Sequence, residues 1–227
     1  SEIKYVCRNV DIIMARLIKN ETVELFGKNA TVPFINGCDN SYHPCQILAD
    51  ALTILEKFGT LDVNLMYIGA KNNVFNSHVE FFSKMKKGTL YGLTPLVNET
   101  ACGPDFYEEA KKSGHYIELD PAMSMEEAKE YANKMDVLYT DTWVDMEFFN
   151  NPAYQKQKEE TLAKMMPYQL NGDFTKDSKA IVFHDMPMHV GFEISQDVVD
   201  KNLDHILDEA ENRRHAEKAV MYTLLNS

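Results

Sequence analysis

The sequence predicts an α/β fold built on a doubly wound parallel sheet, and two observations support this. Short runs of apolar and β-branched residues alternate along the chain with longer amphipathic segments. Strands that alternate with helices of ~10–15 residues are typical of parallel β-α units. The 227 residues, 44% of them hydrophobic and 26% charged, are also enough for one domain or two small ones with a buried core.

The alternation defines fourteen elements. The expected strands cover residues 11–16, 32–37, 63–69, 89–95, 115–121, 136–140 and 180–184. The expected helices cover residues 20–29, 43–59, 76–88, 103–114, 124–135, 151–165 and 204–226.

The sequence also contains signals for the ends of helices and for a boundary between two parts of the chain. Ser124 and Glu127, three residues apart, predict a capping box, and Gly88 and Gly114 are expected as the C′ residues of the helices before them. A boundary is expected near residues 58–62, with two β-α units before it. Two units cannot close a sheet of the usual four to six strands, so the first part is expected to be a fragment of a domain.

Composition narrows the classes of partner. The formal net charge of −12 argues against a nucleic acid, whose phosphates need clustered Lys and Arg. It suits a cationic or amine-bearing small molecule, although acidic charge more often serves solubility. No apolar run approaches the roughly 20 residues that cross a bilayer, so no membrane partner is expected. A cytoplasmic location is expected instead. The four cysteines lack CxxC spacing, which favours free thiols over a disulfide frame or a zinc site.

Polar residues follow five of the expected strands. Ligands of open α/β sheets collect at the carboxyl ends of the strands, so these residues are expected to face one rim. Each one also has a structural explanation, because turns and helix caps use the same residue types and a tryptophan is more often a packing residue. The set comprises Arg16, then Asn36, Gly37, His43 and Gln46, then Asn72 and Asn73, then Asp141, Thr142 and Trp143, and finally His184 and Asp185.

The segment FHDMPMH, residues 183–189, leaves its chemistry open. Asp185 stands between His184 and His189, which allows a metal site, an acid–base pair, or neither. No further set of metal ligands converges on it by spacing, which disfavours the metal.

Six segments in a fixed order resemble one known family. HPCQILADALTILE, IGAKNNVFNS, YTDTWV, YQLN, FHDMP and AENRRHAEKAVM are similar to segments of the ornithine and related carbamoyltransferases. The resemblance covers essentially the whole chain from Glu2 onward. It implies transfer of a carbamoyl group from carbamoyl phosphate to an amine with release of phosphate, no metal or organic cofactor, and a homotrimer.

The resemblance also implies a domain plan. Residues 1–60 correspond to the C-terminal part of a carbamoyl-phosphate-binding domain. Residues 61–227 correspond to a Rossmann-like domain that binds an amine or amino acid, with a C-terminal helix that returns to the first domain.

Site residues carry over by position. The resemblance assigns Arg16 and His43 to the carbamoyl oxygen, Gln46 to the carbamoyl amide, and Arg213 to positive charge beside that group. It assigns Asn73 and Asp141 to the α-amino and carboxylate end of an amino-acid substrate. The expected substrate-binding set is completed by Asn72, Asp145, Met146, His184 and Met186.

Two departures add negative charge where the amine would bind. Asp185 replaces the cysteine of the family's His-Cys-Leu-Pro. The segment from Asp141 to Glu147 reads DTWVDME where ornithine enzymes have Asp-x-Trp-x-Ser-Met-Gly, so Asp145 replaces a serine. Both changes suit a cation such as a diamine, and Asp185 is expected to bind a cationic amine or accept its proton.

The family's Ser-x-Arg-Thr phosphate loop is not found in these 227 residues. The expectation is therefore either a fragment of a carbamoyltransferase of ornithine or diamine type, or a non-catalytic homologue that binds amines. A nucleotide-binding Rossmann domain would show GxGxxG, and the nearest segment, GAKNNVFNS, has only Gly69.

Overall fold

The structure is a computed structural model that describes residues 2–144 and 146–227, without the side chains of residues 146 and 147. All seven expected strands form. The N-terminal part contains α1 (Glu2–Val6), β1 (Ile13–Arg16), α2 (Asn20–Asn29), β2 (Phe34–Cys38) and α3 (Pro44–Phe58). The remainder contains β3 (Asn64–Lys71), α4 (Asn73–Met85), β4 (Thr89–Val97), α5 (Pro104–Lys111), β5 (Tyr116–Glu118), α6 (Met125–Ala132), β6 (Val137–Thr140), α7 (Met146–Phe149), η1 (Pro152–Tyr154), α8 (Gln155–Met165), η2 (Met166–Tyr168), α9 (Gly172–Thr175), β7 (Ile181–His184) and α10 (Gln196–Leu225).

The larger sheet has the strand order β5-β4-β3-β6-β7, and all of its neighbours are parallel. The chain builds outward from β3 through β4 to β5, then returns to the other side of β3 for β6 and β7. This reversal creates a topological switch point between β3 and β6, where open α/β sheets bind ligands. The smaller sheet pairs β1 with β2, also in parallel.

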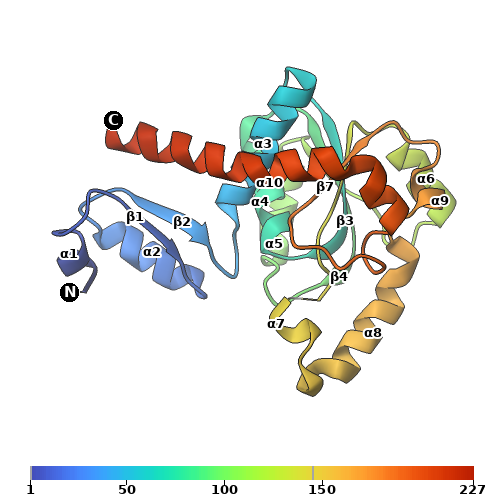
Figure 1. The fold of residues 1–227 in the computed structure, drawn as a ribbon, viewed down its shortest axis with the longest axis horizontal. Coiled ribbons are helices and arrows are strands. Elements are labelled where there is room, and N and C mark those ends of the chain that lie inside the picture. Colours follow the sequence, from blue (N-terminus) through green and yellow to red (C-terminus); the bar gives the residue numbers. More distant parts are fainter. Residues whose placement is uncertain (1, 145) are drawn as a thin grey trace.

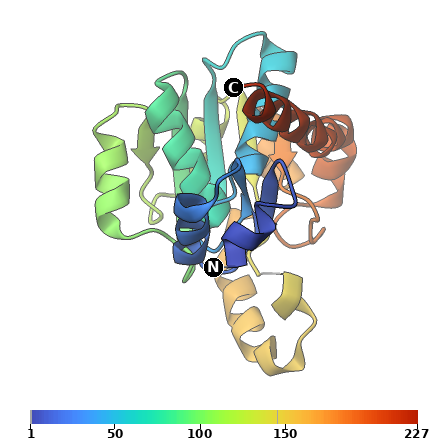
Figure 2. The same cartoon turned by 90° about the vertical axis from the view of Figure 1, so that its left-hand side faces the viewer.

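Helices cover both faces of the five-stranded sheet, as the doubly wound prediction requires (Figure 2). Alternate residues of β3 supply the two cores: Leu65 and Tyr67 face one side, and Met66 and Ile68 face the other. The first core packs against α3, α4 and α5, and the second against α6, α9 and α10. All four side chains are fully buried, which explains why the sequence of this part of β3 is apolar without interruption.

The 30-residue helix α10 connects the two parts of the molecule. It leaves the larger sheet beside β7, crosses α3 and extends above the β1–β2 unit (Figure 1). Residues from α3 and α10 are thereby held side by side although they are far apart in sequence. No helix in the described ranges is long and apolar enough to cross a membrane.

Several boundaries differ from the expected ones. α4 starts at Asn73 rather than at residue 76, because the Asn72 side chain accepts from the Phe75 backbone N–H and caps the helix earlier. α10 begins at Gln196, a full two turns before residue 204. The capping box of Ser124 and Glu127 is confirmed.

The assignment of two glycines as C′ residues is wrong. Gly88 and Gly114 lie two residues beyond the C-caps Lys86 and Lys112, one position later than expected. Both have a positive φ, so they still make left-handed turns after their helices.

Gly88→Ala is expected to lower the free energy of unfolding by at least about 2 kcal/mol. Gly88 has a φ of +66°, and a Cβ there would lie 2.2 Å from the Val63 carbonyl oxygen, a backbone atom that cannot turn away. Urea unfolding measures the change. The control is Gly59→Ala, at a φ of +70° but with nothing within 4 Å of the added Cβ, which is expected to cost about 1 kcal/mol from conformation alone. Equal losses at both glycines would contradict the steric argument.

Candidate functional site

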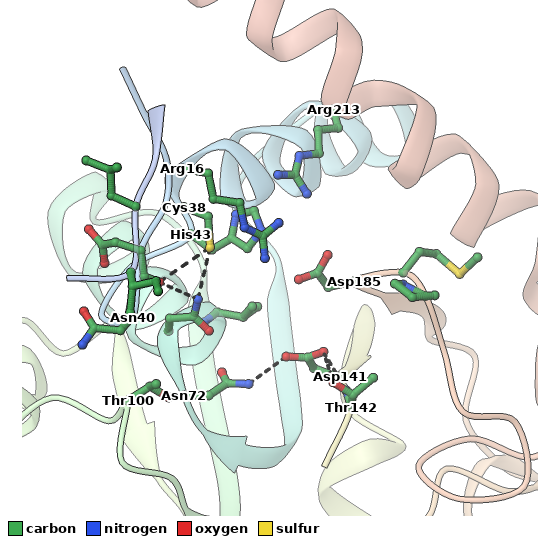
Figure 3. A pocket seen from close by; sticks show the side chains of 17 residues that line it. Arg16, Cys38, Asn40, His43, Asn72, Thr100, Asp141, Thr142, Asp185 and Arg213 are labelled. Atoms are coloured by element: carbon green, nitrogen blue, oxygen red, sulfur yellow. Dashed lines mark hydrogen bonds between the residues drawn. The ribbon is translucent and has the colours of Figure 1, made fainter. Parts of the chain in front are cut away.

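A pocket of about 510 Å³ lies between the two parts of the chain, at the carboxyl ends of the parallel strands. Its walls come from the ends of β1, β2, β3, β6 and β7, and from α10 (Figure 3). The switch point of the larger sheet therefore opens toward the β1–β2 unit. The lining side chains belong to Arg16, Leu17, Ile18, Cys38, Asp39, Asn40, His43, Asn72, Asn73, Val74, Thr100, Asp141, Thr142, Asp185, Met186, Pro187 and Arg213.

One side of the pocket is cationic and contains a neutral imidazole. Arg16, His43 and Arg213 lie together there although they come from β1, the start of α3, and α10 (Figure 3). His43 is buried, and its backbone N–H donates to Ser77 Oγ at 2.7 Å. Burial, followed by the charges of Arg213 and Arg16, lowers the pKa of His43 to about 3. The imidazole is therefore uncharged at neutral pH and has one N–H to donate.

Arg213 is held at the pocket by two contacts. Its Nε donates to Glu217 Oε1 at 3.3 Å, one turn further along α10, and its Nη1 donates to Gln46 Oε1 at 3.2 Å. The second contact joins α10 to α3. The guanidinium thus has a fixed direction before any ligand binds.

Gln46 is not among the described residues that line the pocket, and its expected contact with a carbamoyl amide stays a prediction. It is 3% exposed, and its Nε2 donates to Asp50 Oδ1 at 3.0 Å and to Glu209 Oε1. Both amide hydrogens are occupied by carboxylates, so the side chain is turned toward the interior.

The opposite side of the pocket is acidic. Asn72 Nδ2 donates to Asp141 Oδ2 at 2.7 Å across the β3–β6 switch point, and the Thr142 backbone N–H donates to Asp141 Oδ1 at 2.6 Å. Burial raises the pKa of the Asp141 carboxyl above its usual value, whereas His184 and the Asn72 amide act in the opposite direction. Asn72 also caps α4. Asn72 therefore serves both as a helix cap and as a residue of the pocket.

Asp185 lies between the two sides (Figure 3). Within the described part of the chain, its carboxyl makes no hydrogen bond, although the pocket arginines stand opposite. Burial raises the pKa of Asp185 well above its usual value, and Asp141 and Asp50 raise it further, against the opposing charges of Arg213 and Arg16. The carboxyl is therefore positioned to take up and release a proton at the centre of the pocket.

Asn73 joins the two parts of the chain at the pocket wall. Its Nδ2 donates to the Asp39 carbonyl oxygen at 2.9 Å and to Cys38 Sγ at 3.4 Å. The amide that was expected to grip an amino acid is therefore engaged with the loop after β2.

His184 lies behind the pocket wall, and its expected contact with substrate stays a prediction. It is fully buried, its Nε2 is 3.1 Å from Glu193 Oε1, and its backbone N–H donates to Glu209 Oε2 at 3.1 Å. Successive residues of a strand point to opposite sides, which explains why His184 turns inward while Asp185 reaches the pocket. Met186, 40% exposed, does line the pocket.

The remaining expected site residues include two that the structure leaves open. Asp145 lies outside the described residues, as does the side chain of Met146.

His189 stacks on Phe149, with 3.6 Å between ring centroids, and its backbone N–H donates to Glu193. The two histidines of FHDMPMH thus diverge from Asp185. Across residues 2–144 and 146–227, no group of three His, Cys, Asp or Glu side chains is placed to hold a metal.

Sequence reasoning missed the loop between β2 and α3. Asp39 Oδ1 accepts from the backbone N–H groups of Ser41 and Tyr42, both at 2.7 Å, and its Oδ2 accepts from the Asn20 and Asn36 amides, both at 2.8 Å. An aspartate followed by Asn-Ser after a strand is a turn signal that could have identified this loop. Cys38, Asn40 and Thr100 also line the pocket and carried no earlier signal.

The fold and this pocket define a class of protein. It is a doubly wound α/β protein with a small-molecule pocket at its switch point, and this pocket has arginines on one side and carboxylates on the other.

Comparison with known proteins gives the family. Residues 61–224 match the Asp/Orn binding domain of aspartate/ornithine carbamoyltransferase, and residues 2–56 match the carbamoyl-P binding domain of the same enzymes. The chain belongs to the aspartate/ornithine carbamoyltransferase family.

Individual relatives agree with this result. The ornithine carbamoyltransferase of Chlorobaculum tepidum is 35% identical over 229 residues, which cover 98% of this chain and 63% of that protein. The ornithine carbamoyltransferase of Pyrococcus horikoshii is 37% identical over 238 residues, covering 98% of this chain and 68% of the relative. The solved ornithine carbamoyltransferase from Pyrococcus furiosus superposes with a TM-score of 0.83 at 34% identity, covering 100% of this chain and 70% of its own. The chain thus spans about two thirds of the length of these relatives.

Proposed function

We propose that this chain carries out carbamoyl transfer from carbamoyl phosphate to the amine of ornithine or of a related amino acid or diamine, releasing phosphate. The observation that carries the proposal is the polarity of the pocket: arginines and a neutral imidazole on one side, carboxylates on the other. Residues 1–60 supply most of the anion side and residues 61–227 the amine side. The family's enzymes, to which the chain is related over both parts, support the same chemistry.

The proposed reaction forms one bond and breaks one. The neutral amine nitrogen attacks the carbamoyl carbon, and the C–O bond to phosphate breaks, with its electron pair leaving on the phosphate oxygen. Arg16, Arg213 and the His43 N–H stabilise the negative charge that develops on the carbonyl oxygen. The proton released by the amine passes to Asp185 or to the departing phosphate.

The described acceptor side favours an amine whose recognition does not depend on a carboxylate. Asp141 and Asp185 attract a cation, and the Asn72 and Asn73 amides already donate to protein oxygens. Among the described lining residues, the only cations are Arg16 and Arg213, on the carbamoyl side. A diamine therefore fits the acceptor side better than an amino acid, whose carboxylate would meet two acidic groups.

The test is a transfer assay on the purified chain with carbamoyl phosphate and a panel of amines: putrescine, ornithine, lysine and aspartate. Formation of a ureido product with release of phosphate is expected, at a higher kcat/KM for putrescine than for ornithine and none with aspartate. Amine binding without any transfer, measured by isothermal titration, would contradict the proposal and favour the alternative, an inactive amine-binding homologue or a fragment that lacks the phosphate loop.

We also propose an assembly and a location for the chain. A homotrimer in the cytoplasm is what the family resemblance implies, and sedimentation of the chain tests the trimer.

A further inference from the structure

A cluster of buried polar side chains stands behind Arg213, where α3, α4 and α10 meet. We define it as Gln46 and Asp50 on α3, His78 on α4 and Glu209 on α10. Each is at most 3% exposed. None lines the pocket, so the reaction as described above makes no direct use of the cluster.

The hydrogen bonds of Gln46 fix its orientation. A carboxamide NH₂ donates twice, and the two hydrogens of Gln46 are taken by Asp50 Oδ1 at 3.0 Å and by Glu209 Oε1. Reversing the amide would place its oxygen against two carboxylates. The oxygen must therefore face the other way, where it accepts from Arg213 Nη1 at 3.2 Å.

The two carboxyls are themselves held. His78 Nδ1 lies 3.1 Å from the Val74 carbonyl oxygen, which can only accept, so Nδ1 carries a hydrogen. His78 Nε2 lies 3.3 Å from Asp50 Oδ2, so one edge of the imidazole faces this carboxyl. The second oxygen of Glu209 accepts from the His184 backbone N–H at 3.1 Å. Three elements thus determine where the two carboxyls stand.

We propose that Asp50 and Glu209 are positioning residues that lock Gln46, so that its carboxamide oxygen orients the Arg213 guanidinium toward the anion in the pocket. The proposal rests on the function proposed above in taking that anion to be carbamoyl phosphate. Buried carboxyl groups are costly to desolvate, and burial and Asp50 raise the pKa of Glu209 well above its usual value. Such groups add little stability by themselves, so their presence calls for a second role. In this arrangement Gln46 acts through Arg213, and α3 and α10 set the geometry together.

A double-mutant cycle distinguishes this role from direct contact between Gln46 and the ligand. Glu209→Gln keeps the shape but replaces one acceptor by NH₂, which would face either Gln46 Nε2 or the His184 N–H, both donors. We expect its Kd for phosphonoacetamide, a carbamoyl phosphate analogue that cannot transfer, to rise about 5- to 20-fold. In an Arg213→Ala background the same change is expected to have less than a twofold effect, because coupled sites are not additive.

Two further variants make the cycle decisive. Asp50→Asn acts on the same cluster from α3 and is expected to behave alike. Glu211→Gln makes the same chemical change on α10 at an exposed residue, whose carboxylate is 60% exposed, and is expected to leave the Kd unchanged. An effect of equal size with and without Arg213, or no effect in the wild-type background, overturns the proposal.

A spectroscopic measurement tests the positioning without relying on ligand binding. The Arg213 Nε–H cross-peak in a ¹⁵N side-chain spectrum, assigned by its loss in Arg213→Lys, is expected to be sharp in the wild type and broadened in Glu209→Gln and Asp50→Asn. If the wild type fails to bind the analogue, the proposed function fails, and this spectrum alone decides on the positioning role. An unchanged cross-peak in both variants would show that the cluster does not orient Arg213.

Discussion

His43→Ala is expected to lower kcat for carbamoyl transfer about 10²- to 10³-fold. The imidazole lines the pocket beside two arginines, and burial holds its pKa at about 3, so it is an uncharged N–H donor throughout the working pH range. Removing one such donor to a developing oxyanion typically costs this much. His43 makes no side-chain cap to α3, so the substitution leaves the start of that helix intact. Steady-state kinetics with saturating amine measures the loss.

The exposed His215→Ala on α10 is the matched control for His43→Ala and is expected to retain full activity. A second readout depends only on folding. The pKa of His43 is depressed in the folded state, so its stabilisation is present above the unfolded value of about 6.5 and is lost as the pH falls toward 3. Between pH 8 and pH 5, the wild type should lose about 2 kcal/mol more than His43→Ala. Retention of kcat within threefold would remove His43 from the reaction.

Asp185→Asn is expected to lower kcat/KM for the amine about 10²-fold while making the protein more stable at pH 8. The lost activity follows from removing the carboxyl that attracts the cation and accepts its proton, a contribution of about 10²- to 10⁴-fold in general acid–base catalysis. The gained stability follows from the pKa of Asp185, which burial, Asp141 and Asp50 raise. A raised carboxyl pKa costs folding stability progressively as the pH rises from the unfolded value of about 3.9 toward the folded value, and the cost is complete above the folded value. An amide cannot ionise and avoids this cost.

The two effects of Asp185→Asn are measured by amine kinetics from pH 5 to 9 and by thermal unfolding. In the wild type, kcat/KM should rise with pH as Asp185 ionises, and this limb should be absent from the variant. The Tm of Asp185→Asn at pH 8 should exceed the wild-type value by at least about 2 °C. The same change at the exposed Asp177 should affect neither quantity. A variant that keeps the pH limb and the amine preference would show that Asp185 is only a counter-ion to the arginines.

The sheet could be predicted from sequence because its strands are buried on both faces. The run from Leu65 to Ile68 has no exposed side chain, so it is apolar without interruption. Helix starts were harder, since they depend on single hydrogen bonds such as the Asn72 cap of α4. The short helices α1, α7 and α9 have four or five residues, too few for a helical period to show.

The sequence predicted those site residues that lie at the ends of strands. Arg16 is the last residue of its strand, whereas Asn72, Asp141 and Asp185 follow theirs, and the structure brings all four to one pocket. The direction of a side chain could not be predicted where partners distant in sequence decide it. Glu209 lies 163 residues from Gln46, and it turns that amide inward.

The path of α10 has a consequence for how the molecule unfolds. The β1–β2 unit has only two strands, so its stability depends on the helices that pack against it. Helix α10 packs against both α3 and β7, so the same apolar and polar surfaces support the N-terminal unit and the edge of the larger sheet. Detaching this helix would therefore expose both at once. The pocket lies between the parts that α3, α10 and β7 hold together, so release of α10 is expected to disrupt it.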